Sequence, residues 1–191
     1  MPATLPVLET ERLILRPRAT EDLDQIALLN ADPQVMRHIA PLGSPAMSRD
    51  GVAARSFSHV ALGLGHWSVF ARADEDAFLG YVGLIPGAED GDDPQLSYRF
   101  GTRHWGKGYA FEASARLVDH GIETLALPAV AILTHPQNEA SCRLAHKLGF
   151  TRLAAASAVL IGDPPVPGAS FRLSREDWRE PLHAASGLNA R

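Results

Sequence analysis

The chain has 191 residues, of which 46% are hydrophobic and 21% charged, and its formal net charge is −4. This length predicts one domain whose core is large enough to fold without a metal or a disulfide. A single cysteine, Cys142, excludes an internal disulfide and a cysteine-rich zinc module. The sequence pI near 6.0 argues against a nucleic-acid-binding protein, and we find no targeting segment or membrane span. We therefore expect a cytoplasmic domain over residues 1–191, with its core at about 8–180 and a mobile tail at 181–191.

The first half of the chain predicts a strand, three helices and three further strands. Alternating apolar residues predict a strand at 12–18, and helical spacing predicts helices at about 20–30, 33–39 and 48–62. Thr20 and Ser48 are expected to cap the first and third of these helices, and Asp32-Pro33 begins the second. The strands that follow are expected at 66–72, 78–85 and 95–100, with a hairpin turn at 74–76.

The second half predicts two long helices and three strands. Phe111, Ala115, Val118, Ile122 and Leu125 recur at intervals of four and three, which is one apolar face of a helix. A strand is expected at 129–133, a helix from Asn138 to a terminating Gly149, and late strands at 150–160 and 170–173. The acidic segment 87–94 and the proline-rich segment 162–168 are expected to be loops. This order predicts an α+β fold around a mainly antiparallel sheet.

A glycine-containing turn between the strand at 95–100 and the next helix is the most informative segment. It contains Arg103-x-x-Gly106-x-Gly108, and glycine lets a backbone approach a ligand closely. Free amides at a helix start form an anion site, although a plain strand-to-helix turn is the alternative interpretation. A Walker loop is excluded because Gly108 follows Lys107, and a dinucleotide fingerprint because Phe111 stands at its third glycine.

These residues resemble a motif of the GCN5-related N-acetyltransferases (GNAT). Asn138-x-x-Ser141, followed by Lys147-Leu-Gly-Phe, resembles the second acyl-CoA motif of the same family. The strings LETERLILR at 8–16 and WGKGYAFEA at 105–113 resemble the branch of ribosomal-protein alanine N-acetyltransferases. The resemblance extends over about residues 8–180.

The resemblance implies an acetyltransferase that uses acetyl-CoA as co-substrate and needs no metal. It implies a mixed, mainly antiparallel twisted sheet flanked by helices, with a splayed central strand pair that holds acyl-CoA. The partners would be acyl-CoA and an amine acceptor, without nucleic acid or membrane, and the protein would be a monomer or homodimer. The cofactor-binding residues implied are Tyr98, Phe100, Gly101, Arg103, Trp105, Gly106, Lys107, Gly108, Tyr109, Ala110, Asn138 and Ser141. Asn138 could equally be a simple helix N-cap.

The chain departs from the resemblance at two positions that matter for proton transfer. Gln95 stands where many members carry a carboxylate, and Ala145 where many carry a tyrosine. We consider three catalytic candidates, namely Ser141 as a proton donor to the thiolate, His135 as a base, and Gln95 as a residue that orients water or the amine.

Each of the remaining polar candidates also has a structural interpretation. His135 could be an exposed residue at a strand end, and Ser141 a buried polar contact or a hydrogen bond to the cofactor. Glu112 is interpreted as structural and Cys142 as packing. Asp90, Asp92 and Asp93 form a solvated turn that could attract a cationic acceptor.

An α-amino group, with a pKa of about 8 against about 10.4 for lysine, needs less help from a base. We therefore expect a protein N-terminal α-amine as the acceptor. The alternatives are a small-molecule amine, such as an aminoglycoside, polyamine or amino acid, and an acyl-CoA-binding domain without catalysis.

Overall fold

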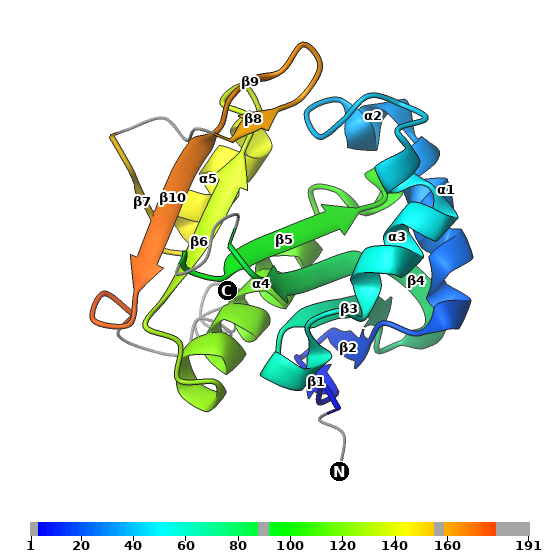
Figure 1. Cartoon of the computed structure of the whole chain (residues 1–191). Helices are drawn as coiled ribbons and strands as arrows, with labels where there is room; N and C mark the ends of the chain where they lie inside the picture. Colours follow the sequence, from blue (N-terminus) through cyan, green and yellow to red (C-terminus); the bar gives the residue numbers. More distant parts are fainter. Residues whose placement is uncertain (1–3, 88–91, 155–158, 179–191) are drawn as a thin grey trace.

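One eight-stranded sheet organises the chain (Figure 1). The computed structural model describes residues 4–87, 92–154 and 159–178. Neighbouring strands are antiparallel except for the parallel pair β5–β6, which confirms the predicted α+β fold. The order across the sheet is β1 (Leu8–Glu9), β2 (Leu13–Pro17), β3 (Gly65–Ala71), β4 (Asp74–Ile85), β5 (Gln95–Phe100), β6 (Ala129–Thr134), β10 (Ala169–Ser174) and β7 (Thr151–Arg152).

Helices cover both faces of this sheet and create two apolar cores. Residues of β3 alternate between them, because successive side chains of a strand point to opposite faces. Trp67 and Val69 join the larger core with α4 and α5, whereas Phe70 joins the smaller core with α1 and α3. The helices are α1 (Leu23–Ala31), α2 (Pro33–Met36), α3 (Arg49–Ser56), α4 (Tyr109–Asp119) and α5 (Glu139–Lys147).

The central strands β5 and β6 meet at one point and then diverge. Gln95 of β5 is opposite Ala131 of β6, and no other residues of these two strands are paired within the part of the chain that the structure describes. The backbone N–H of Ala131 donates to the carbonyl of Pro94 at 2.9 Å. The two strands separate toward their carboxyl ends, which leaves an opening inside the sheet (Figure 1). This is the splayed strand pair that the sequence resemblance implies.

Several details of the first half differ from the sequence predictions, and the second helix ends at Met36 and not near residue 39. Thr20 does not cap α1, because it begins a 3-10 turn (Thr20–Asp22) and Asp22 stands at the cap position of the helix. The backbone N–H of Ala19, just before this turn, donates to the Asp22 carboxylate at 2.9 Å. The hairpin turn lies at 72–73 and not at 74–76, since β4 already begins at Asp74. The third helix is capped by Ser48 as predicted but ends at Ser56, and a 3-10 turn at Val60–Leu62 follows. The two-residue strand β1 was not predicted.

Of the two predicted late strands, the one at 170–173 is confirmed by β10, whereas the other differs more. The predicted unbroken strand at 150–160 is wrong, because among its described residues only Thr151–Arg152 (β7) pairs with β10, and Leu153 and Ala154 lie outside any strand. Leu160–Ile161 (β8) pairs instead with Val166–Pro167 (β9) in a separate two-stranded sheet. Residues 155–158, Asp90 in the acidic segment and the tail at 181–191 lie outside the described residues. Among the described helices, none has the length and hydrophobicity needed to cross a bilayer.

Candidate active site

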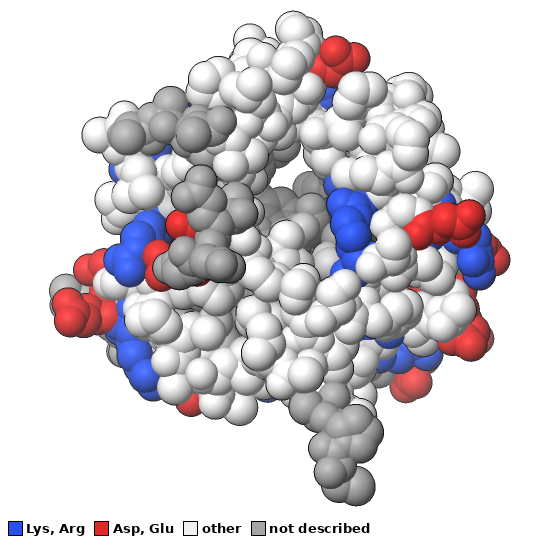
Figure 2. Space-filling view, in the orientation of Figure 1, with Lys and Arg blue, Asp and Glu red and all other residues white. Residues whose placement is uncertain are grey.

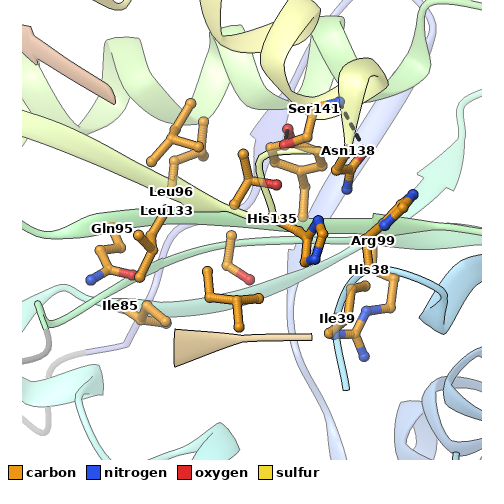
Figure 3. Close-up of a pocket in the computed structure, with 15 residues that line it drawn as sticks. His38, Ile39, Ile85, Gln95, Leu96, Arg99, Leu133, His135, Asn138 and Ser141 are labelled. Carbon is orange, nitrogen blue, oxygen red and sulfur yellow. Dashed lines mark hydrogen bonds between the residues drawn. The ribbon is translucent and has the colours of Figure 1, made fainter. Parts of the chain in front are cut away.

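A cleft of about 170 Å³ lies where β5 and β6 diverge (Figure 3). Its walls are the facing residues of the two strands, the first turn of α5, and a segment just after α2. It brings together five of the residues that the sequence singles out, and adds others that no motif indicated. The predicted residues in the cleft are Gln95, Tyr98, His135, Asn138 and Ser141.

Asn138 and Ser141 enter the cleft because β6 turns directly into α5. The Asn138 carboxamide oxygen accepts from the backbone N–H of Ser141 at 3.2 Å, which caps the helix (dashed in Figure 3). Both residues also line the cleft. The capping interpretation and the ligand-binding interpretation of Asn138 are therefore compatible, since the capped first turn faces the opening.

Two hydroxyl groups from opposite walls meet in this cleft. The phenol oxygen of Tyr98 on β5 lies 2.5 Å from Oγ of Ser141 on α5. Burial raises the pKa of Tyr98 to about 12, against the smaller lowering effect of the Ser141 hydrogen bond, so the phenol keeps its proton at neutral pH. Ala145 is fully buried in the larger core, so that position of α5 contributes no group to the cleft. Tyr98 supplies a phenol from the facing strand.

Two histidines form the other side of the cleft. His135 is only 8% exposed, so the prediction of an exposed histidine at a strand end is wrong. Its ring centroid lies 5.1 Å from that of His38, and a Cβ added at Gly162 would lie 2.6 Å from its Cδ2, so these two residues cover it. Nδ1 of His135 accepts from the backbone N–H of Gln137 at 3.1 Å, which leaves the Nε2 position as the second polar atom of the ring.

His38 is a residue that no sequence pattern indicated. Burial, followed by the charges of His135 and Arg37, lowers the pKa of His38 from its usual value. The imidazole is therefore neutral near pH 7 and can accept a proton. It stands in no motif, and only the tertiary structure brings its ring to the cleft, beside that of His135.

The opposite end of the cleft carries Gln95, beside the single β5–β6 pairing (Figure 3). None of the described residues that line the cleft is a carboxylate. The groups available for proton transfer are therefore hydroxyls and imidazoles, and the Gln95 amide can only orient a water or the amine.

The other predicted cofactor-binding residues lie outside this cleft, in the turn between β5 and α4 and at the start of α4. Gly106 and Gly108 both have left-handed backbones, with φ of 73° and 81°. A Cβ added at Gly106 would meet no protein atom within 4 Å, so the backbone there is open to a ligand. Arg103, Trp105 and Lys107 are exposed. An open turn of this kind at a helix N-terminus fits the pyrophosphate of a coenzyme.

Residues near the start of the chain stabilise this turn through hydrogen bonds. Glu112 is only 4% exposed. Its carboxylate accepts from Nε of Arg12 at 2.7 Å, from the backbone N–H of Arg12 at 3.0 Å, and from the Thr10 hydroxyl at 2.5 Å. Nη1 of Arg12 then donates to the carbonyl of Lys107 at 3.0 Å. Glu112 is thus a structural residue, as predicted, and it acts on the turn through Arg12.

Three further residues that the sequence singled out, Phe100, Asp93 and Cys142, take part in core packing or in an ion pair. Phe100 is buried in the larger core, and its carbonyl accepts from the Trp105 indole N–H at 2.8 Å, so only its backbone faces the turn. Asp93 pairs with Arg172 at 2.7 Å. Cys142 packs against the larger core. Among the described residues, no group of three His, Cys, Asp or Glu side chains is arranged to hold a metal ion.

A second cavity, of about 420 Å³, adjoins the cleft. Ile85, Ser97 and Arg99 line both spaces. A molecule in the second cavity would therefore lie next to whatever occupies the cleft.

Comparisons with known proteins identify relatives of this chain. Residues 12–151 match a family model described as an acetyltransferase (GNAT) domain. The uncharacterized protein YkkB of Bacillus subtilis is 34% identical over 147 residues, which are 75% of this chain and 84% of that protein.

Solved structures share the fold over nearly the whole chain. An acetyltransferase from Agrobacterium tumefaciens superposes with a TM-score of 0.74 at 27% identity, covering 89% of this chain and 95% of that one. A ribosomal-protein-S5-alanine acetyltransferase from Vibrio fischeri gives a TM-score of 0.71 at 18% identity, covering 92% of this chain and 100% of that one. The fold is therefore shared with the branch that the strings at 8–16 and 105–113 resemble.

Proposed function

The chain belongs to the GNAT family of N-acetyltransferases, which take their acetyl group from acetyl-CoA, and from that premise we propose that it acetylates an α-amino group by direct transfer. The observation that carries this proposal is the composition of the cleft, which has a hydroxyl pair, two histidines and no carboxylate among its described lining residues. A protein N-terminal α-amine is the acceptor that we favour.

The choice of an α-amine follows from the weakness of the available bases. An unperturbed α-amino group has a pKa of about 8 and a lysine side chain about 10.4, so deprotonating the lysine at neutral pH costs about 3 kcal/mol more. No described lining residue of the cleft is a carboxylate whose charge could favour loss of the ammonium proton. Burial lowers the pKa of His38, which makes its imidazole a weaker base than an ordinary histidine. The acceptor best matched to this cleft is an amine that is already partly deprotonated.

The proton steps are assigned to opposite walls of the cleft. On one side, His38 accepts the proton of the attacking amine, directly or through a water held by Gln95. His135 lies beside it, and its Nδ1 is engaged by the Gln137 backbone N–H. On the other side, the Tyr98–Ser141 pair donates a proton to the departing thiolate, and the raised pKa of Tyr98 keeps that proton in place until it is needed. Alignment of the two substrates supplies much of the remaining rate enhancement.

The coenzyme is assigned to the turn and to the strand edges. The backbone at 103–110 would hold the pyrophosphate, Asn138 would hydrogen-bond the pantetheine arm, and the open edge of β5 near Tyr98 and Gly101 would pair with it. The single domain, the cytoplasmic location and the monomeric or homodimeric state belong to the same proposal.

A small-molecule α-amine is the second candidate. The observation that favours it is the second cavity of about 420 Å³, because that volume lies in the range of sites for small ligands. The protein acceptor is supported by the branch resemblance and by the fold shared with the ribosomal-protein-S5-alanine acetyltransferase of Vibrio fischeri.

The experiment measures release of free coenzyme A thiol from acetyl-CoA with purified protein. Peptides with a free N-terminus and blocked lysines are compared with peptides that have a blocked N-terminus and free lysines, and with amino acids and polyamines. We expect turnover on free α-amines that rises with pH to about 8 and then levels off. Turnover confined to lysine side chains and still climbing past pH 10 would show that the acceptor assignment is wrong.

A further inference from the structure

The second cavity is lined by cationic side chains that the proposed chemistry does not use. It lies between α1, α3 and strands β3 to β5, on the side of the sheet opposite the larger core. Its ionisable residues with basic side chains are Arg18, Arg55, Arg99, His59 and His66, and no described lining residue is a carboxylate. Figure 2 shows a hollow on this face with Lys or Arg side chains at its border near α3.

Two of these arginines are buried and incompletely paired. Arg18 is 8% exposed and Arg99 is 9% exposed. Nη1 of Arg18 donates to the Ser56 hydroxyl at 2.9 Å, and Nη1 of Arg99 donates to the Asn30 carboxamide oxygen. Nε and Nη2 of Arg18 and Nε of Arg99 are buried and have no hydrogen-bond partner among the described residues, and the same is true of Nδ1 of His66.

The surroundings of Arg18 offer only weak compensation for its charge. The Arg18 guanidinium lies over the Tyr81 ring at 4.5 Å, and Asp22 acts on it without a hydrogen bond between them in the structure. Oδ2 of that carboxylate accepts instead from the Ser68 hydroxyl at 2.7 Å and from the Ala19 backbone N–H at 2.9 Å. Burial lowers the pKa of Arg18 to about 10, which reflects a cation held away from water.

A buried guanidinium without a full set of acceptors costs free energy, and an anionic oxygen ligand recovers it because the planar fork binds such a group through two parallel hydrogen bonds. We propose that this cavity binds a negatively charged group, a carboxylate or a phosphate, carried by the acceptor amine. Arg18 and Arg99 hold that group, and Arg99, which also lines the cleft, sets its position relative to the reacting amine. This inference rests on the proposed acetylation of an amine and specifies its substrate class.

The same charges discriminate against polycationic acceptors. A polyamine or an aminoglycoside would place further positive charge beside Arg18, Arg55 and Arg99, where no described carboxylate lines the cavity. Like charges brought together in a partly buried site repel strongly. The acceptor is therefore an anionic α-amine and not a polyamine.

The test uses pairs of acceptors that differ in an anionic group on the residue after the one that carries the amine. Ala-Glu-amide is compared with Ala-Gln-amide, and Ala-phosphoserine-amide with Ala-Ser-amide, so that the carboxylate and the phosphate are separate arms. We expect kcat/KM to be about tenfold or more higher for the charged member of at least one pair, as for a charge-assisted hydrogen-bonded pair. The arm with the larger ratio identifies the anion.

Substitutions of the cavity arginines test whether the cavity causes the difference in kcat/KM between charged and neutral acceptors. Arg18→Gln and Arg99→Gln should bring the ratio close to one. Arg49→Gln is the matched control, because Arg49 lies on α3 but is half exposed, pairs with Asp24, and does not line the cavity. Thermal unfolding of each variant shows whether it is folded, and Arg55→Gln, at an exposed position of the cavity wall, gives a second and smaller reduction of the ratio.

The outcomes separate the two proposals. Equal kcat/KM for both members of both pairs would overturn the anion site while leaving the acetylation of α-amines in place. Turnover on Ac-Lys-Glu-amide but not on Ac-Lys-Gln-amide or on any free α-amine would overturn the α-amine assignment while supporting the anion site.

Binding of an anion to the cavity can be measured even if no acceptor is acetylated. In the presence of coenzyme A, glutarate or inorganic phosphate should raise the melting temperature of the protein, whereas the neutral isostere glutaramide should not, and Arg18→Gln should abolish the increase. No increase with either anion would overturn the inference.

Discussion

The phenol of Tyr98 and the hydroxyl of Ser141 lie 2.5 Å apart, so a strand and a helix on opposite walls of the cleft share one hydrogen bond. In the proposed reaction this pair is the proton donor, and its two residues are 43 positions apart in the chain. Tyr98→Phe and Ser141→Ala should each lower kcat by about 10- to 100-fold, as expected for loss of a general acid, with a much smaller change in the Kd for acetyl-CoA.

Steady-state kinetics and calorimetric titration of acetyl-CoA test this pair. Cys142→Ala, at the next residue of α5, is the control and should change neither quantity, because Cys142 packs against the core. Equal losses of turnover and of binding in Ser141→Ala would mean that Ser141 only holds coenzyme A.

The open backbone at Gly106 should be required for coenzyme binding. Gly106→Ala places a methyl group where a phosphate is proposed to bind, and we expect a loss of affinity for coenzyme A of at least about tenfold. Gly43→Ala is a matched control, since Gly43 and Gly106 have φ of 75° and 73° and neither has a protein atom within 4 Å of an added Cβ.

Both glycine substitutions should cost about 1–2 kcal/mol of stability, because the left-handed conformation is strained for alanine. Only Gly106→Ala should lose the thermal stabilisation by coenzyme A, which is about 2.7 kcal/mol at a hundredfold excess over Kd in the wild type. Similar losses of coenzyme binding in both variants would point to general backbone strain.

The buried Glu112 should stabilise the fold and support the glycine turn. Glu112→Gln weakens a charge-assisted network that joins Thr10, Arg12 and, through Arg12, the Lys107 carbonyl. We expect a loss of about 2–3 kcal/mol of unfolding free energy and weaker coenzyme binding. Glu139→Gln should cost less than about 0.5 kcal/mol, since its pair with Arg143 is an exposed i,i+4 pair. Urea denaturation of both variants measures the difference, and equal losses would contradict the bridging role of Arg12.

His66 should make stability depend on pH. Burial, followed by the positive charges of Arg18, Arg55, Arg99 and His59, lowers the pKa of His66 to about 3 from its ordinary value of 6.5. Between these two values the unfolded chain binds a proton that the folded protein excludes. This contribution to stability is therefore fully present above pH 6.5 and is lost as the pH falls toward 3, by at most about 1.4 kcal/mol per pH unit.

The measurement compares unfolding free energies at pH 7 and pH 5. His66→Gln should show a smaller decrease than the wild type, whereas His146→Gln, at an exposed position of α5, should decrease as the wild type does. Identical decreases in the wild type and His66→Gln would show that the folded protein protonates His66 without cost.

The local patterns of the chain predicted its elements well where one side of the element is buried. Helix α4 was found from apolar spacing, and Asn138 and Ser48 were identified as caps because capping needs only a side-chain oxygen and the next turn. The late strand at 170–173 was also found, as β10 (Ala169–Ser174). The strand at 150–160 was not, because the pairing of β8 with β9 depends on a contact that local composition does not encode.

The sequence by itself determined the family, the α+β fold, the glycine turn and the position of Asn138 at the start of α5, because each depends on residues close together in the chain. Only the tertiary structure decided what meets in the cleft and beside it. The Tyr98–Ser141 pair, the burial of His135 against His38, and the cavity that joins Arg18 to Arg99 each unite distant segments. Charge and pKa at these sites depend on distance and burial, which are properties of the packed molecule and not of any one segment.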